Sequence, residues 1–392
     1  MRGTDTARGR LAVVALALAA CGDGSTPPPS PAAAVGLTAV ASVDVPANYG
    51  IHDAFVRDGL AFVCAWNTGV IIYDVGNGVV GGTPGAPREV GRIVTDPGNT
   101  GGARAHNAWW FHNPNSRQRR YLFVGQEGPG QLGASSSGDI HVVDVSNLAA
   151  PMEVASYRMS GTSLPAGTHN FWMDEAAEIL YAAYYNGGVV ALDVSGTLQG
   201  DLASRELARI RPGGDSTYVW GVQRHAGSVY ATDMLSGLFQ LRFTGTSFTI
   251  AAAGDGLTSD RFASDLWVHG DYAYTGTWGS RVSAGNVVNV WRLDDNGRPD
   301  HLGELALDNV GTVGDVEVSA DGAVLLLATE RGPAAGLYLY SLADPERPAP
   351  LASVMFPEGV HTATLADIGG RRYAFAAKNP PAPALLIYEL TR

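Results

Sequence analysis

The sequence is poor in cysteine, with only Cys21 and Cys64 among its 392 residues. They form no CxxC motif, so a disulfide-stapled fold is excluded, and we expect Cys64 to be a buried free thiol. Basic runs are missing too, and acidic residues outnumber Lys and Arg by 38 to 26, which argues against a nucleic-acid partner. The P-loop, the HExxH motif and the dinucleotide fingerprint are also absent, so no motif names an enzyme class.

The first apolar run is "LAVVALALAA" (11–20), which is too short to span a bilayer as a mature helix. It follows a basic start and ends at Cys21, and it resembles the lipobox of bacterial lipoprotein signals. The resemblance implies a signal peptide over 1–20, a lipid anchor on Cys21, and an extracytoplasmic location at the outer membrane or cell surface. A plain secretory signal is the alternative. Residues 21–35 contain "GDGSTPPPSPAAA", which predicts an extended tether.

The rest of the chain repeats. Seven apolar runs share one pattern, and its polar residue falls at Asp74, Asp144, Asp193, Arg242, Arg292, Ser341 and Glu389. Successive spacings are 70, 49, 49, 50, 49 and 48 residues, and loop-like insertions at 96–105 and 127–138 account for the long first interval. Each unit also has two runs upstream and a looser one after. Four short strands in about fifty residues predict one blade of a β-propeller.

The ends of the repeat array predict how the ring closes. The last unit stops after its third strand, whereas "GLTAVASVDV" (36–45) is a strand without a unit. We therefore expect an all-β, seven-bladed propeller over residues 36–392, in which the N-terminal strand pairs with 384–390 in the last blade. Closure would leave no exposed sheet edge there.

"GVIIYDV" (69–75), "HVVDVSNLAAP" (141–151) and "YLYSLADPERPAP" (338–350) resemble the LVIVD repeat of bacterial and archaeal surface proteins. The resemblance implies the propeller architecture over 36–392. It is clearest in the first three blades, which keep the Asp, and a role tied to that Asp is in doubt in the other four. A shared fold does not by itself define an activity.

One mouth of the central channel is the expected ligand-binding face, because the inner strands begin there and the second strands end there. The candidate ligand-binding residues at this face are Trp66, Glu127, Tyr185, Trp220, Asp233, Asp265, Trp278, Asp315, Glu330 and Lys378. For Trp66, Trp220 and Trp278, packing in the core is the alternative to stacking on a flat ligand.

Four histidines take the same place in blades 1, 2, 3 and 7, namely His52, His106, His169 and His361. In blades 4, 5 and 6 the corresponding segment begins with Trp220, Asp265 and Asp315, which are expected nearby instead. One interpretation is structural, in which each polar residue fastens its inner strand to a neighbour. The other is a site for Zn, Cu or Fe, because imidazoles that converge on one point suit these ions. The remaining five histidines are predicted to be surface or loop residues.

Two functions follow from these observations. The first is a lipid-anchored, monomeric propeller that binds a small molecule or a protein at the channel mouth. The second is a metal-dependent enzyme, an oxidoreductase or a hydrolase, with a transition metal held by the four histidines.

Overall fold

The computed structural model describes residues 35–46, 50–95, 103–131, 135–161, 166–279 and 281–391. The predicted signal peptide, Cys21 and nearly all of the tether lie outside these residues. The regular secondary structure of the described residues consists of β-strands and two short 3₁₀ turns, at Ala203–Arg205 and Gly214–Ser216. Within these residues, no helix has the length and apolar character needed to cross a membrane.

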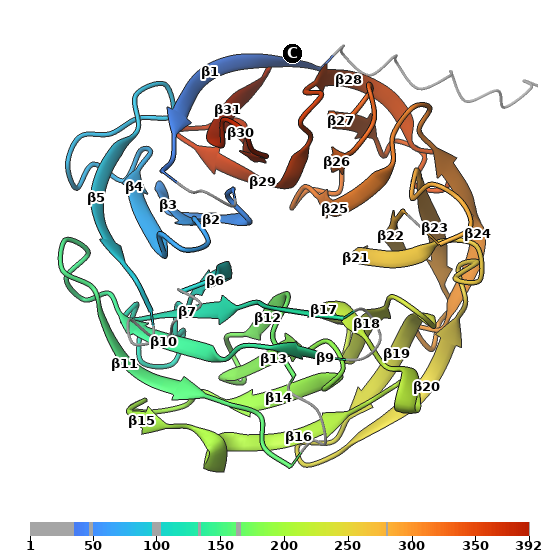
Figure 1. Ribbon diagram of the computed structural model, residues 1–392, viewed down its shortest axis with the longest axis horizontal. Coiled ribbons are helices and arrows are strands. Elements are labelled where there is room, and N and C mark those ends of the chain that lie inside the picture. Colours follow the sequence, from blue (N-terminus) through green and yellow to red (C-terminus); the bar gives the residue numbers. More distant parts are fainter. Residues whose placement is uncertain are drawn as a thin grey trace, which may run out of the picture. The chain divides into compact units, whose positions relative to one another are not determined.

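Seven blades of four antiparallel strands form a ring, with each inner strand bordering the central channel (Figure 1). A short strand, β15 (Gly200–Asp201), pairs parallel with the outer strand of blade 2. From the inner to the outer strand, blade 1 contains β2 (Asp53–Arg57), β3 (Leu60–Cys64), β4 (Val70–Asp74) and β5 (Arg88–Ile93), and blade 2 contains β6 (Ala105–Trp110), β7 (Tyr121–Gln126), β10 (Ile140–Asp144) and β11 (Met152–Tyr157). Blade 3 contains β12 (Phe171–Asp174), β13 (Ile179–Ala183), β14 (Val189–Asp193) and β16 (Glu206–Ile210). Blade 4 contains β17 (Val219–His225), β18 (Ser228–Asp233), β19 (Gly237–Phe243) and β20 (Phe248–Gly254). Blade 5 contains β21 (Phe262–His269), β22 (Tyr272–Trp278), β23 (Val287–Leu293) and β24 (Pro299–Ala306). Blade 6 contains β25 (Thr312–Val318), β26 (Val324–Glu330), β27 (Gly336–Ser341) and β28 (Ala349–Met355). Blade 7 contains β29 (Val360–Ile368), β30 (Arg371–Lys378), β31 (Ala384–Thr391) and β1 (Gly36–Asp44). The seven-bladed prediction is confirmed.

The N-terminal strand closes the ring as predicted. Strand β1 pairs antiparallel with β31, from Gly36 opposite Thr391 to Asp44 opposite Ala384. Blade 7 is therefore built from both ends of the propeller and has its outer edge covered.

The middle strands of each blade are buried on both faces, because neighbouring blades pack against each side. Every residue of β3 and β4 is buried, which explains why these strands are continuous apolar runs instead of alternating ones. Outer strands such as β5 are half-exposed. The core is accordingly divided into clusters between adjacent blades, and Cys64 lies in one of them as a free thiol.

Two local predictions need correction. The insertion at 127–138 is not only loop, since β8 (Gly128–Gln131) and β9 (Ser135–Ser137) pair as a small hairpin. His141 is not a surface residue: it is buried on β10, and its Nδ1 lies 2.7 Å from Oε1 of Glu153. A Gly- and Ser-rich hairpin looks like a loop in the sequence, and a buried histidine looks like a surface residue because it is polar.

Candidate metal centre

A β-bulge near the start of most inner strands shapes the channel mouth. The strand pairing shifts between Ala105 and Asn107 in blade 2, and blades 4, 5, 6 and 7 have the same irregularity. A bulge inserts an unpaired residue and re-aims side chains. His106 is the inserted residue in blade 2. The side chains of both His106 and Asn107 can therefore face the channel, although consecutive side chains of a regular strand point to opposite faces of the sheet.

The register sorts the inner strands into two layers. The first layer, nearest the mouth, contains His52, His106, His169, Trp220, Ser264, Gly314 and His361; the second contains Asp53, Asn107, Asn170, Gly221, Asp265, Asp315 and Thr362. The prediction that Asp265 and Asp315 take the histidine position is thus wrong by one residue. They belong to the second layer.

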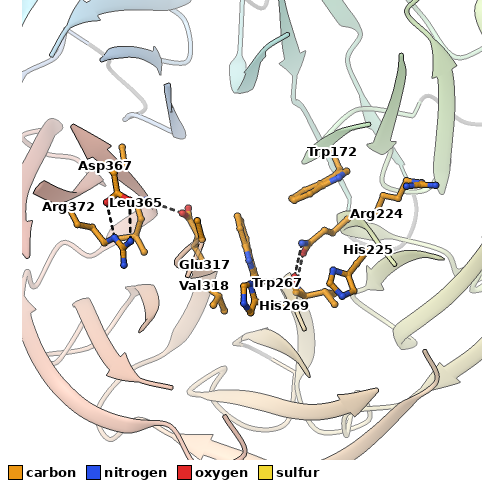
Figure 2. A pocket seen from close by; sticks show the side chains of 14 residues that line it. Trp172, Arg224, His225, Trp267, His269, Glu317, Val318, Leu365, Asp367 and Arg372 are labelled. Carbon is orange, nitrogen blue, oxygen red and sulfur yellow. Dashed lines mark hydrogen bonds and ion pairs between the residues drawn. The ribbon is translucent and has the colours of Figure 1, made fainter. Parts of the chain in front are cut away.

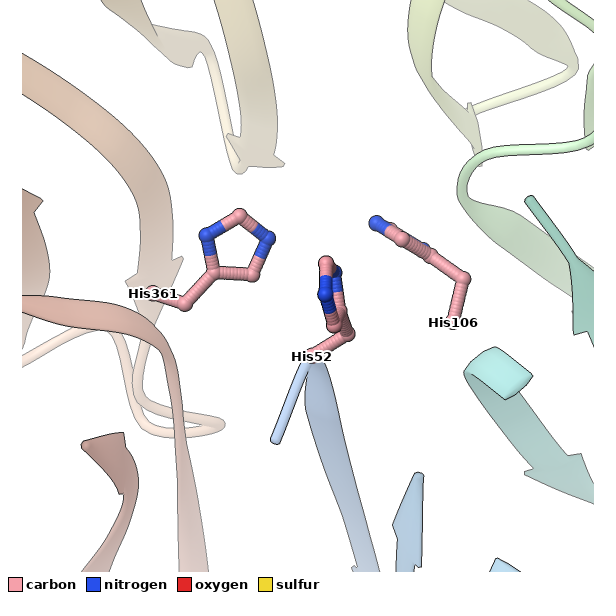
Figure 3. A group of neighbouring side chains, drawn as sticks. All are labelled: His52, His106 and His361. Atoms are coloured by element: carbon pink, nitrogen blue, oxygen red, sulfur yellow. The ribbon is translucent and has the colours of Figure 1, made fainter. Parts of the chain in front are cut away.

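The four histidines do meet, as predicted. Ring centroids are 4.6 Å apart for His52 and His361, 5.3 Å for His52 and His106, and 4.1 Å for His106 and His169. Figure 3 shows the rings of His52, His106 and His361 grouped at the channel mouth. One potential ligand atom from each of these three lies within 4.8 Å of the others, and the same holds for His106, His169 and Glu127. His106 joins the two groups.

Hydrogen bonds fix the orientation of two of these rings. Nδ1 of His169 lies 2.9 Å from the carbonyl oxygen of Trp220, so Nδ1 carries the proton and Nε2 keeps its lone pair. Nδ1 of His361 lies 2.5 Å from Oε1 of Glu330. Metal-binding histidines are usually held in this way, by a carbonyl or carboxylate on the nitrogen that does not face the metal.

His106 is buried without any hydrogen bond to either ring nitrogen in the described part of the chain. Leaving a buried polar group unsatisfied costs roughly 1–3 kcal/mol. Burial, followed by the proximity of His169 and His361, holds the pKa of His106 well below its usual range, so the ring is neutral at pH 7. Nε2 of His169 is also unsatisfied. A neutral, unsatisfied imidazole is the form that binds a metal.

The charge of the centre is set by two carboxylates. Burial lowers the pKa of His361, but Glu330, by its charge and its hydrogen bond, outweighs this and raises it overall. Glu127 has its carboxylate 3.7 Å from Nε2 of His106 and accepts a hydrogen bond from the hydroxyl of Tyr185. Burial raises the pKa of Glu127. Glu127, Tyr185 and Glu330 therefore belong to the predicted site.

Aromatic rings wall the centre. Trp66 stacks on His52 at 4.1 Å between centroids, and Trp220 lies 4.0 Å from His169. Trp278 is 5.0 Å from Trp220 and is only partly buried. Trp220 packs as core, whereas Trp66 and Trp278 keep surface that a ligand could contact.

Two further predicted ligand-binding residues contact groups of the protein itself. Asp233 is fully buried and accepts the backbone N–H groups of Tyr218 and Leu235, at 2.6 and 3.0 Å. Lys378 has its amine 4.0 Å from the carboxylate of Glu358. A charged residue at the end of a second strand is thus a weak sign of a site.

His169 and His361 make the inter-blade contacts that the structural interpretation assigns to the histidines, through Trp220 and Glu330, and residues of the second layer make similar contacts. Asp315 accepts the backbone N–H of Ala363 at 2.7 Å, and Asp53 accepts that of Ala108, in each case from the next blade. Burial, then the charge of Asp315, raises the pKa of Asp53 to about 7. Burial, then the neighbouring Asp265, raises that of Asp315. Asp53 was not among the predicted ligand-binding residues, although its place beside His52 matches that of Asn107 beside His106.

Comparison with known proteins supports the repeat. Two segments, residues 134–159 and 260–281, match the family model of the LVIVD repeat. The chain carries LVIVD repeats. The first segment covers the predicted run in blade 2, whereas the second lies on β21 and β22, closer to the channel than the run noted in blade 5. No curated protein matches the sequence.

Among solved structures, this LVIVD-repeat chain is similar to the computationally designed Ika8 protein. The TM-score is 0.53 at 9% identity, and the match covers 90% of this chain and 99% of the other. At this identity the likeness concerns the fold alone.

Proposed function

We propose that this propeller binds a transition-metal ion at its channel mouth, between His52, His106, His169 and His361. The observation that carries the proposal is the convergence of imidazoles from four blades, with the pKa values of the buried His106 and His169 held well below their usual range. His106 is central, because both of its ring nitrogens lack hydrogen bonds among the described residues.

The distances fit an ion after small movements. Metal–nitrogen bonds of about 2.0–2.1 Å place two ligands of one ion no more than about 4 Å apart. Within each group of three, the ligand atoms lie within 4.8 Å of one another, so movements of about an ångström would bring the atoms of one group to bonding distance of a shared ion. Imidazole with one nearby carboxylate suits Zn, Cu or Fe better than Ca or Mg, which prefer oxygen ligands.

The broader function is that of a binding module that presents this ion to a small molecule or a protein. Trp66 and Trp278 supply partly exposed aromatic surface beside the histidines. An extracytoplasmic, lipid-anchored location, favoured by the lipobox-like sequence at Cys21, would bring such a module to a membrane surface.

A metal-dependent enzyme is the second candidate. It is favoured by Glu127, a partly solvent-accessible carboxyl with a raised pKa that lies 3.7 Å from Nε2 of His106. Such a group could exchange a proton with a molecule bound beside the ion.

The test is metal analysis of protein purified without a His tag and exposed in turn to Zn²⁺, Cu²⁺ and Fe²⁺. We expect about one equivalent of one of these ions, which His106→Ala removes while the propeller stays folded. His225→Ala, at the other end of the channel, is the matched control and should keep the metal. Equal metal content in all three proteins would reject the proposal.

A further inference from the structure

The end of the channel opposite the histidines holds two adjoining hollows that neither proposed function uses. One has a volume of about 360 Å³ and the other about 480 Å³, and both are lined by Trp172 and Arg224 (Figure 2). Cavities of this size are in the range of small-ligand sites.

Four aromatic residues from different inner strands line this end. Phe55 and Trp109 lie 5.2 Å apart, Trp109 and Trp172 5.5 Å, and Trp172 and Trp267 6.0 Å between ring centroids. The two Trp–Trp contacts are edge-to-face, at 61° and 80°, so these indoles are not stacked face to face. Each of the four is only partly buried, which leaves aromatic surface directed at the hollows.

Charged groups around these rings occur as pairs. Arg57 makes two hydrogen bonds to Glu175, at 2.5 and 3.0 Å, and Arg224 lies 3.0 Å from Asp174. On the other side, Arg372 makes two hydrogen bonds to Asp367, at 2.9 and 3.1 Å, and two to Asp321, at 3.0 and 3.1 Å. These contacts fix planar donor and acceptor groups in place and leave no uncompensated positive charge among the three arginines.

We propose that this end of the channel is a binding site for a neutral saccharide. A pyranose ring has an apolar C–H face that packs on an indole, and its hydroxyl groups match planar carboxylate and guanidinium groups in pairs. A strongly anionic ligand has no uncompensated cation among the three arginines. A flat ring without hydroxyl groups would add no hydroxyl hydrogen bonds to these ion pairs.

One further group supports this choice. Glu317 lies in the hollow of Figure 2, and its Oε1 accepts the backbone N–H of Leu365 at 3.0 Å. Burial raises the pKa of Glu317 to about 8, so its carboxyl is neutral at pH 7 and can donate a hydrogen bond to a hydroxyl oxygen.

The test is a glycan array that contains neutral and acidic glycans, followed by calorimetry with the neutral glycan that binds best and with adenine as a flat ring without hydroxyl groups. We expect binding of a neutral glycan, weakened roughly tenfold or more by Trp172→Ala or Trp267→Ala. Trp66→Ala, at the other mouth, should bind the glycan as the unchanged protein does.

The outcomes separate this site from the metal centre. Glycan binding should persist after treatment with EDTA and in His106→Ala, whether or not the metal proposal is correct. Absence of glycan binding on the array, binding of acidic glycans only, tighter binding of adenine, or equal loss in Trp66→Ala would each overturn the saccharide site.

Discussion

Asp74, Asp144 and Asp193 close the turns that follow the third strands. Each accepts the backbone N–H two residues further on, at 3.0, 2.9 and 2.9 Å, and Ser341 does the same at 3.2 Å. The polar residue of the repeat thus forms an Asx or Ser turn. Its role is local and structural, which explains why a serine can replace the aspartate in blade 6.

Asp74 makes the most of these bonds, since it also accepts N–H groups from Gly78, Val80 and Gly82. Burial opposes ionisation, but these backbone bonds outweigh it and hold the pKa of Asp74 well below its usual range. We predict that Asp74→Ala lowers the free energy of unfolding at pH 7 by on the order of 2 kcal/mol, because several donors lose a charged acceptor. Urea unfolding measures this loss. Ser341→Ala, which removes one neutral acceptor, is the control, and an equal loss in both variants would contradict the argument.

For Asp53 we predict the opposite effect, namely that its replacement raises the free energy of unfolding. The folded chain keeps its proton up to about pH 7, whereas an unfolded aspartic acid releases it near 3.8, so this group's contribution to stability falls between those pH values. Asp53→Asn keeps an acceptor oxygen, as Asn107 and Asn170 do in blades 2 and 3. We expect it to stabilise the fold by about 2 kcal/mol at pH 8 and by little at pH 4. Thermal unfolding at both values measures this, and a pH-independent effect would be inconsistent with a buried titrating carboxyl.

At the scale of elements, the strands and their order were predictable because apolar runs recur at almost constant spacing. The bulges were not, because an inserted residue such as His106 leaves no mark in that periodicity. This is why Asp265 and Asp315 were predicted one position too early. The hairpin of β8 and β9 was missed for a related reason, since a Gly- and Ser-rich segment has no pattern typical of strands.

We predict that the closing strand, β1, is needed for the stability of the propeller. Deleting residues 36–44 should expose the edge of β31, a strand with five consecutive buried residues, and promote association with other chains. We expect a lower melting temperature and aggregates by light scattering. A variant that lacks residues 1–34 keeps β1 and serves as the control. If the shorter protein stayed monomeric and equally stable, β1 would not be needed for closure.

At the scale of the whole molecule, the sequence indicated the ring and the contiguity of the four histidine-bearing blades. It could not show which nitrogens meet, because that depends on hydrogen bonds between blades, such as the one from His169 to Trp220. The opposite end of the channel was missed altogether. Its residues, including Trp172 and Trp267, look like core positions until the strands are placed side by side.

We expect an ion bound at the metal centre to stabilise the closed ring in addition to strand β1. An ion held by His361, His52, His106 and His169 would join blades 7, 1, 2 and 3. It would add to the contacts between blades 7 and 1, which include a shared hydrophobic cluster and a hydrogen bond from Thr362 to the carbonyl of His52. Binding to the folded state at 100 times Kd contributes about 2.7 kcal/mol. Since the entropy of unfolding of a propeller of about 350 residues is roughly 0.7 kcal/mol/K, the melting temperature should rise by about 4 °C.

This stabilisation should depend on pH in a defined direction. A bound ion must displace the proton of His361, whose pKa lies above 6.5, whereas His106 and His169 are already neutral. The rise in melting temperature should therefore be larger at pH 7.5 than at pH 5.5, as differential scanning calorimetry with and without the ion would measure. His106→Ala should abolish the rise at both values, and His225→Ala should leave it intact. A rise that is unchanged in His106→Ala would mean that the ion stabilises the ring from some other place.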